Sequence, residues 1–167
     1  VATQDCADSI LVRVHRVTGA GIITDGRIFI CRNGNVGEIG HIQVYPLGER
    51  CHCGNFGCLE TIAANAAIEQ RVRHLLGQCY QSRVTLDDCS IKNICKAANK
   101  GDALACEVIE QVGRQLGKTI AIAINLSNPQ KVVIAGEIVE AENVLLPALD
   151  GRNNTQSLQA CRPNLPV

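Results

Sequence analysis

The sequence predicts an α/β fold, and three observations lead to that prediction. Three short β-patterned segments follow one another between residues 9 and 31. Amphipathic helical patterns come next, and an apolar run, Lys131 to Ala135, follows the longest of them. The chain contains two Phe, two Tyr and no Trp, so its core must consist mainly of Ile, Val, Leu and Ala, as in α/β proteins rather than β-sandwiches.

The strands are predicted from alternation and from turn chemistry. Ser9 to Arg16 alternates Ile and Val with wetter positions, which is typical of a strand with one wetter face. We expect Thr18 to Gly21 to form a glycine turn and Gly21 to Thr24 to form a second strand. Asp25-Gly26 is a strong hairpin signal, so Arg27 to Cys31 is the expected return strand. Together these segments predict an antiparallel meander.

The middle of the chain carries helical periodicity. One helix is expected from Glu60 or Thr61 to Gly77, and a second from Asp87 to Asn99. Asp102 is suited to cap a third, unusually long helix, which Asn128-Pro129 ends. The apolar stripe of this third helix consists of Ala105, Val108, Ile109, Val112, Leu116, Ile120 and Ile124.

The remaining elements complete the predicted order. A further short strand is expected at Ile42 to Tyr45, a buried strand at Lys131 to Ala135 ending at Gly136, and a helix at Ala141 to Leu149. Asp150 to Asn154 has the composition of a turn, and the tail that follows to Val167 is too weakly patterned to indicate an element. The order β-β-β-α-β-α suits one domain with a ribonuclease H-like lobe.

Composition limits the class of protein. The 167 residues carry a formal net charge of zero, so nothing indicates a basic nucleic-acid surface on this chain. No signal peptide is visible, and no apolar run approaches the roughly 18 residues of a membrane span. We therefore expect a cytoplasmic protein with no membrane partner. Because the sequence starts at Val1 and contains no Met, we expect it to be a fragment of a longer protein.

The ten cysteines fall into two groups. Cys51, Cys53 and Cys58 cluster within eight residues beside Gly54 and Gly57, and His41 lies ten residues upstream. Three cysteines and one histidine make a complete tetrahedral ligand set for zinc, so we predict a structural site with no open position for water. The scattered cysteines are interpreted as reduced thiols, several of them buried, rather than a disulfide framework. They are Cys6, Cys31, Cys79, Cys89, Cys95, Cys106 and Cys161.

Two alternatives stay open for this cluster. The three thiols could be free or disulfide-bonded, although their tight spacing favours metal. His52 lies between two of the cysteines and is the rival fourth ligand; adjacent side chains usually diverge, which favours His41. His15 and His74 are interpreted as ordinary surface or partly buried histidines.

Two carboxylates bracket the cysteine loop. Glu38 lies between Gly37 and Gly40, and glycines there suggest a close approach to the backbone. Glu60 opens a predicted helix, where it has an ordinary explanation as the acidic residue of a first turn. Carboxylates beside an imidazole are natural partners for sugar hydroxyls, so Glu38, His41 and Glu60 are the candidate sugar-binding residues. His41 would use one ring nitrogen for zinc and the other for a hydroxyl.

The segment Thr18-Gly19-Ala20-Gly21 is a weak candidate for phosphate binding. Glycine turns between strands are usually only turns, and a backbone nest for phosphate is the less common reading. We keep Thr18, Gly19 and Gly21 as a candidate phosphate turn.

With these motifs in hand, the sequence resembles the ROK family of repressors, open reading frames and sugar kinases. The resemblance is carried by Gly37-Glu38-Ile39-Gly40-His41 and by Cys51-x-Cys53-Gly54-x-x-Gly57-Cys58-Leu59-Glu60, and it extends over nearly the whole chain. It is strongest with the repressor branch of the family.

This resemblance implies an actin-like, ribonuclease H-like fold, of which residues 1–167 would be most of the C-terminal lobe with an inserted zinc loop. It implies zinc on His41, Cys51, Cys53 and Cys58, and sugar contacts from Glu38, His41 and Glu60. For the repressor branch it implies the effector N-acetylglucosamine 6-phosphate. It also implies operator DNA bound through an N-terminal domain outside this chain, and a homodimer or homotetramer.

The alternative is an ATP-dependent sugar kinase of the same family, and the sequence departs from that branch. Val17-Thr18-Gly19 stands where the kinases usually have Gly-Thr-Gly, and Ala135-Gly136-Glu137 stands where they usually have paired glycines. A carboxylate at Glu137 is a poor neighbour for ATP phosphates. The catalytic Asp of the kinases would belong to a segment before Val1. We therefore expect a sensor of the sugar rather than an enzyme.

Overall fold

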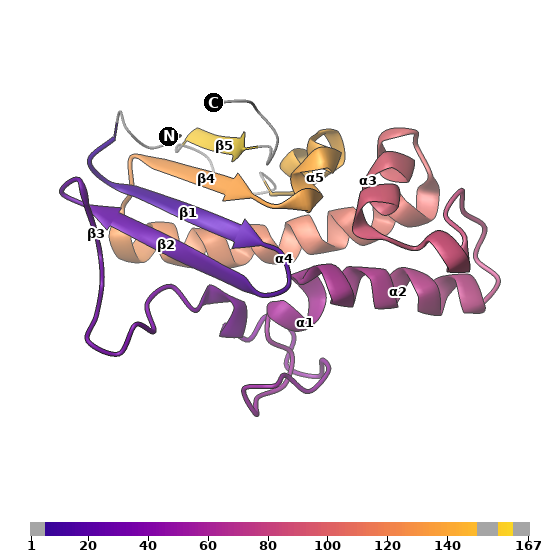
Figure 1. The fold of residues 1–167 in the computed structure, drawn as a ribbon, viewed down its shortest axis with the longest axis horizontal. Coiled ribbons are helices and arrows are strands. Elements are labelled where there is room, and N and C mark those ends of the chain that lie inside the picture. Colours follow the sequence, from indigo (N-terminus) through magenta and orange to yellow (C-terminus); the bar gives the residue numbers. More distant parts are fainter. Residues whose placement is uncertain (1–5, 150–156, 162–167) are drawn as a thin grey trace.

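The centre of the computed structural model is a five-stranded mixed sheet (Figure 1), and the structure describes residues 6–149 and 157–161. The strand order is β3-β2-β1-β4-β5. Strands β1, β2 and β3 form the predicted antiparallel meander, whereas β4 and β5 run parallel to β1. The strands span Ser9–Val14 (β1), Thr18–Thr24 (β2), Arg27–Ile28 (β3), Lys131–Ala135 (β4) and Ser157–Cys161 (β5).

The helices pack on one another and on the sheet around the long helix α4. In Figure 1 α4 runs along the sheet, and it also packs against α2, α3 and α5. Short 3-10 turns occur at residues 39–41, 86–88 and 137–141. The α-helices span Glu60–Ala63 (α1), Asn65–Gly77 (α2), Ile91–Asn99 (α3), Ala103–Ser127 (α4) and Glu142–Leu149 (α5).

One hydrophobic core joins the sheet to α4. Strand β1 buries Ile10, Val12 and Val14 and leaves Leu11 exposed, which is the alternation that its sequence predicts. All members of the predicted α4 stripe are buried except Ile124, which is partly buried against the same core. The structure therefore confirms the prediction that the long amphipathic run forms one long helix with its apolar stripe in the core.

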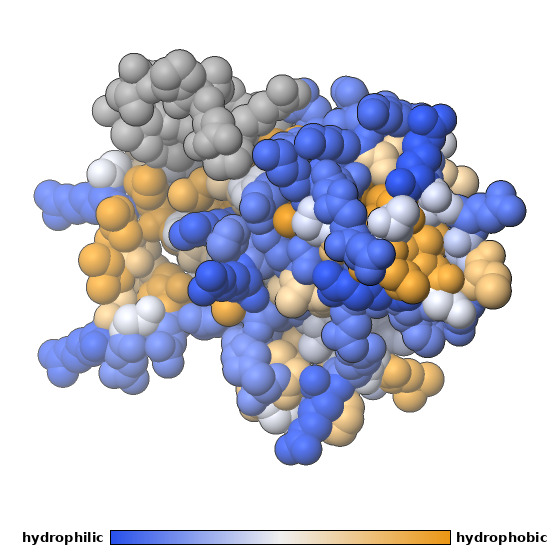
Figure 2. Space-filling model, turned by 45° about the vertical axis from the view of Figure 1, so that its right-hand side comes forward, coloured by the Kyte–Doolittle hydropathy of each residue, from blue (hydrophilic) through white to orange (hydrophobic). Residues whose placement is uncertain are grey.

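The surface is mixed rather than uniformly polar. Figure 2 shows hydrophobic side chains reaching the surface in patches among hydrophilic ones. At the β3 end of the sheet the exposed apolar side chains are Ile28, Phe29 and Ile30. No helix in the part of the chain that the structure describes is long and apolar enough to cross a membrane.

The glycine-rich segment after β1 is a strand and not a turn. Thr18 opens β2, Gly19 pairs with Arg13 of β1, and the bend lies at residues 15–17. The predicted turn at Thr18 to Gly21 is therefore wrong, and β1 ends at Val14 rather than Arg16. The absence of side chains at positions 19 and 21 does not break an extended strand that is fully paired with its neighbour.

Two other strand predictions also fail. Strand β3 ends at Ile28 and does not continue to Cys31. Residues 42–45 form no strand; Gln43 makes only an isolated antiparallel bridge with Cys58. Both segments contain residues that favour strands, but neither lies beside a strand with which it could form a longer ladder.

The first predicted helix is divided at Ala64. This residue has an extended ψ of 145°, so α1 ends and α2 begins at Asn65. The division leaves the Asn65 amide free to donate to the carbonyl of His15 at 2.8 Å, which ties α2 to the end of β1. The sequence favours helix on both sides of Ala64, as predicted, but the hydrogen bond from Asn65 to His15 takes the place of one hydrogen bond within the helix.

Two boundaries in the second half of the chain differ from expectation. Helix α3 begins at Ile91, because residues 86–88 form a separate 3-10 turn, and not at Asp87. Strand β5 lies in the tail where the sequence indicated no element, and it pairs in parallel with β4. The predicted turn at residues 150–154 lies outside the described residues. Strand β5 was not predicted because a parallel edge strand depends on its distant partner, here β4, more than on its own sequence.

Asp102 caps α4 as predicted and also organises the segment before it. Its carboxylate accepts hydrogen bonds from the amides of Ala105 (2.9 Å) and Arg83 (2.6 Å) and from the Ser82 hydroxyl (2.9 Å). Burial acts to raise the pKa of Asp102, but these hydrogen bonds outweigh it and hold the pKa below its ordinary value of 3.8.

We expect Asp102→Ala to lower the free energy of unfolding by more than the roughly 1–2 kcal/mol of an ordinary lost N-cap. The additional loss arises because the Arg83 amide and the Ser82 hydroxyl also lose their acceptor. Since the folded-state pKa is depressed, the contribution is complete above the unfolded pKa and is lost as pH falls through the folded value. Urea unfolding at pH 7 and near pH 3 measures both effects. Asp87→Ala, at an exposed position, is the control, and equal stability of the two variants would contradict the prediction.

Candidate functional site

The cysteine loop follows the 3-10 turn at residues 39–41 and is held by local hydrogen bonds and isolated bridges rather than by a core of its own. Apart from the bridge between Gln43 and Cys58, it contains one further bridge, between Arg50 and Phe56. The Cys51 amide donates to Asn55 at 2.7 Å, and its carbonyl accepts from Gly54 at 3.0 Å. This tight turn brings the cysteine side chains to one side of the loop.

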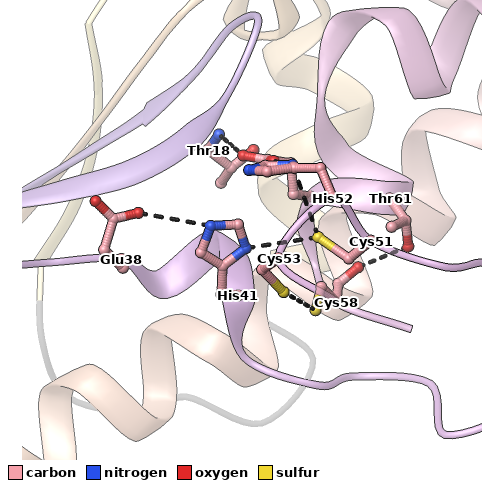
Figure 3. Close-up of polar contacts among 9 residues, drawn as sticks. Thr18, Glu38, His41, Cys51, His52, Cys53, Cys58 and Thr61 are labelled. Atoms are coloured by element: carbon pink, nitrogen blue, oxygen red, sulfur yellow. Dashed lines mark hydrogen bonds and ion pairs between the residues drawn. The ribbon is translucent and has the colours of Figure 1, made fainter. Parts of the chain in front are cut away.

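Four side chains converge there, as Figure 3 shows. One ligand atom from each of His41, Cys51, Cys53 and Cys58 lies within 4.8 Å of all the others. His41 Nδ1 is 3.6 Å from Cys51 Sγ, and the sulfurs of Cys53 and Cys58 are 3.7 Å apart. Zinc–sulfur and zinc–nitrogen bonds of about 2.3 and 2.0 Å in a tetrahedron require edges of about 3.5–3.8 Å, so these atoms fit a tetrahedral metal ion.

The chemistry of the thiols also fits a cation. The sulfurs of Cys53 and Cys58 are far from the roughly 2.05 Å of a disulfide bond, and all cysteines in the described residues whose side chains are placed are free. Burial, reinforced by the neighbouring sulfurs, raises the pKa of Cys58 to about 12, whereas the Asn55 amide lowers the pKa of Cys53. A divalent ion would supply the positive charge that three adjacent thiolates need.

His52 does not join the cysteine cluster. Its Nδ1 lies 3.0 Å from Oε1 of Glu60 but 3.9 Å from Cys51 Sγ. The His41 ring is met at its edge by the His52 ring, with centroids 5.0 Å apart. The arrangement therefore favours His41 as the fourth ligand, and it gives His52 a different partner.

The structure brings the three candidate sugar-binding residues together beside the cluster. His41 Nε2, the nitrogen opposite the cysteine side, lies 3.8 Å from Glu38 Oε2. Glu60 is only 8% exposed, and its Oε2 accepts a hydrogen bond of 3.0 Å from the Thr18 amide. Figure 3 shows Glu38 and His41 facing each other across from the Thr18 contact. Two carboxylates and a histidine N–H edge can accept from and donate to several hydroxyls.

The glycines around Glu38 serve a close approach, and the approaching element is β2. A Cβ at Gly37 would lie 1.7 Å from the Ala20 carbonyl oxygen, and one at Gly40 would lie 2.2 Å from that of Thr18. Gly37 also accepts a hydrogen bond of 2.7 Å from the Ala20 amide. These glycines therefore place the backbone of Glu38 and His41 directly on the sheet.

A second polar group lies at the carboxyl ends of the parallel strands β1 and β4. Glu137 follows Gly136 at the end of β4 and accepts a short hydrogen bond from the Asn65 side-chain amide, while His15 Nε2 lies 3.9 Å from the same carboxylate oxygen. The candidate phosphate residues Thr18, Gly19 and Gly21 lie in β2 and form no turn. Their role with phosphate stays a prediction.

The other cysteines whose side chains the structure places are free, and they differ in burial. Cys89 and Cys95 are buried, and burial raises the pKa of Cys95 to about 12. Cys6, Cys31 and Cys106 are half-buried, whereas Cys79 is exposed.

Sequence reasoning missed two contacts of the site, one within the cysteine loop and its adjoining helix and one between residues far apart in the chain. His52 was considered only as a metal ligand, although a histidine between two ligands can turn its ring outward to a carboxylate. The contact between Asn65 and Glu137 joins residues 72 positions apart, and only the unusual carboxylate after a strand-ending glycine hinted at it. A groove of about 530 Å³ is a further feature without a sequence signal. It lies behind the loop, where Tyr45, Leu47 and Glu49 face α2 and α4, and its lining contains none of the candidate sugar residues.

The strand order, the parallel pairing of β1 with β4 and the central helix α4 define the class: a lobe of the actin-like, ribonuclease H-like α/β fold. The ROK family model matches residues 1–165, and the chain belongs to this family.

Individual relatives agree with this assignment. The chain is 81% identical over 166 residues to the N-acetylglucosamine repressor of Escherichia coli O157:H7, which covers 99% of this chain and 41% of the relative. The crystal structure of a ROK family transcriptional regulator, a homologue of the E. coli Mlc protein, has 44% identity and a TM-score of 0.89 over 96% of this chain and 43% of its own. A ROK family glucokinase from Streptomyces griseus, in complex with glucose and AMPPNP, has 26% identity and a TM-score of 0.73 over 95% of this chain and 56% of its own. The chain thus spans less than half the length of the repressor relative.

Two glycines of the loop offer a matched test of the candidate metal centre. Gly57 and Gly54 both have positive φ, of 63° and 95°, but only Gly57 is crowded, since a Cβ there would lie 1.5 Å from the Tyr45 carbonyl oxygen. We expect Gly57→Ala to weaken metal retention strongly because the loop must open, and Gly54→Ala to cost only the roughly 1–2 kcal/mol of a left-handed residue. Competition with a chromogenic chelator measures the affinity. Equal retention in the two variants would contradict the prediction.

Proposed function

We propose that this chain is the effector-binding lobe of a sugar-responsive transcriptional repressor of amino-sugar metabolism. The observation that carries the proposal is the 81% identity, over 99% of the chain, to a protein named N-acetylglucosamine repressor. The polar wall formed by Glu38, His41 and Glu60 supports it, because such a wall suits a ligand rich in hydroxyls.

The proposed effector is N-acetylglucosamine 6-phosphate. Glu38 and Glu60 would accept hydrogen bonds from its hydroxyls, and His41 Nε2 would serve a further hydroxyl while Nδ1 faces the metal. Glu38, His41 and Glu60 would form one side of the sugar site, and we propose that its opposite side belongs to another part of the longer protein. Binding would favour a conformation with lower operator affinity, which requires that the effector bind the two conformations unequally.

The proposed metal is zinc in a structural role. Three thiolates and one imidazole are the preferred soft ligand set for zinc, and four protein ligands leave no position for a reactive water. The ion would fix the loop and the orientation of the His41 ring, and no step of a reaction depends on it.

Glu137 argues against the kinase alternative. Ligands of open α/β sheets bind outside the carboxyl ends of the strands, and there the Glu137 carboxylate already takes the Asn65 amide group and lies near His15. A phosphate chain at this edge would meet a carboxylate held in place, which repels it. This lobe is therefore better suited to sensing a sugar than to phosphorylating it.

The remaining parts of the proposal concern the longer protein. We propose that an N-terminal domain binds operator DNA, that residues 1–167 are one C-terminal lobe, and that the protein acts in the cytoplasm as a homodimer or homotetramer. The near-zero net charge of this lobe is consistent with DNA binding elsewhere in the protein.

We expect N-acetylglucosamine 6-phosphate to release the full-length protein from its operator, and Glu38→Gln or Glu60→Gln to weaken effector binding while the fold persists. Losing a charge-assisted hydrogen bond costs about 1.5–3 kcal/mol, which is about tenfold to a hundredfold in Kd. Calorimetry with the effector and gel-shift assays with operator DNA measure the two steps.

Glu107→Gln, at an exposed position of α4, is the matched control and should bind normally. Unchanged affinity in the Glu38 and Glu60 variants would remove these residues from the site. ATP-dependent phosphorylation of an amino sugar by the full-length protein would favour the kinase alternative instead.

We also expect the purified protein to contain about one zinc ion per chain, because the four converging ligand atoms form one closed site. Elemental analysis gives the stoichiometry, and removal of zinc by a chelator should loosen residues 42–59 and expose their amides to hydrogen exchange. The expected change should be smaller in α4, which also packs against α2, α3 and α5. A metal-free protein that stays fully protected in this loop at neutral pH would rule out the structural zinc.

A further inference from the structure

We propose that His52 is a positioning residue of the effector site, which fixes the carboxylate of Glu60 in the orientation that the sugar requires. This inference rests on the proposed function. It assigns to His52 a role different from that of a metal ligand, and it concerns how tightly the effector is held.

The carboxylate of Glu60 is held from two sides. Its Oε2 accepts a hydrogen bond of 3.0 Å from the Thr18 amide, and its Oε1 lies 3.0 Å from His52 Nδ1. Each oxygen therefore has one partner, and the carboxylate cannot rotate about its terminal bond without losing both contacts. Because a carboxylate offers about four lone-pair positions, two remain for hydroxyl groups of a ligand.

The burial of Glu60 makes the loss of either partner costly. Glu60 is 8% exposed, so water is a poor substitute for a lost partner, and a buried acceptor left without a donor is costly. His52, in contrast, is 68% exposed in its side chain. Removal of the His52 ring should therefore affect the orientation of Glu60 much more than the stability of the fold.

A metal ion in the cysteine cluster would limit where His52 can lie. The residue lies between Cys51 and Cys53, so a metal ion on both neighbours would fix its backbone on either side. Its ring meets the edge of the His41 ring at 5.0 Å with an interplanar angle of 73°, which limits where the imidazole can turn. The loop would thus hold two of the three sugar residues: His41 directly and Glu60 through His52.

Glu38 provides a contrast within the same site. Its side chain is 57% exposed, and its contact with His41 Nε2 is long, at 3.8 Å. Among residues 6–149, whose side chains the structure describes, no contact comparable to that of His52 restrains this carboxylate. The structure therefore assigns the fixed acceptor of the site to Glu60 and an adaptable acceptor to Glu38.

The test compares His52→Ala with His52→Asn in the full-length protein, using N-acetylglucosamine 6-phosphate in calorimetry. Asparagine places an amide N–H close to the position of Nδ1, so it should restore the contact. We expect His52→Ala to raise Kd about tenfold and His52→Asn to recover most of that loss. The exposed His74→Ala on α2 is the control and should leave Kd unchanged.

A double-mutant cycle separates positioning from a direct contact with the effector. If His52 acts through Glu60, His52→Ala should have little further effect on Kd in a Glu60→Gln background. The zinc content of each variant, measured in parallel, should stay at the wild-type value.

Each other outcome is decisive. Wild-type affinity in His52→Ala overturns the inference, as does an equal loss in both Glu60 backgrounds or a loss of zinc that explains the weaker binding. A wild-type protein that binds no amino-sugar phosphate overturns the proposed function itself, which is a different result from a binding wild type with an unaffected His52→Ala variant.

Discussion

The convergence of four ligand atoms beside the sheet is the constraint on which the site depends. Of residues 43–56, only Cys51 is buried, so the loop has almost no hydrophobic core with which to fix itself. Its isolated bridges and turn hydrogen bonds would compete poorly with water and with chain entropy. The ligand atoms of His41, Cys51, Cys53 and Cys58 nevertheless lie within 4.8 Å of one another, and two of the distances between them match the edges of a zinc tetrahedron. Coordination of one ion would give this segment the stability that packing does not provide.

The geometry of the polar wall follows from the same cluster. Glu60 comes two residues after Cys58, and the Thr61 hydroxyl donates to the Cys58 carbonyl at 2.8 Å, so the last ligand leads directly into α1. His41 belongs both to the cluster and to the wall. On the other side, the glycines at positions 37 and 40 press this segment onto the backbone of β2. The wall is thus fixed at one end by ligands and at the other by the sheet.

The sequence predicted those features that depend on local chemistry. The alternation of apolar residues predicted the buried face of β1, and the apolar stripe at helical spacing predicted α4. Asp102 was predicted as the N-cap of α4, and the structure confirms it. The tight spacing of the cysteines, with His41 upstream, predicted the cluster of possible metal ligands that the structure brings together. Predictions failed where a distant partner decides. The ladder with β1 extends β2 back to Thr18, the carbonyl of His15 divides the helix at Ala64, and β5 exists because β4 has a free edge. The pairing of His52 with Glu60 was missed for a different reason: the two residues are only eight positions apart, but nothing in the local sequence indicates which way an exposed ring turns.

The bend between β1 and β2 connects the two polar regions of the lobe. At its start, His15 lies near Glu137 at the end of β4; at its close, the Thr18 amide is held by Glu60. The two carboxylates therefore flank one short segment, residues 15–18, although they come from elements far apart in the chain. Here one side presents acceptors with free lone pairs, whereas on the other side a carboxylate of the chain already engages the donors. Because the two carboxylates contact the same short segment from opposite sides, a shift of residues 15–18 would change both polar regions together.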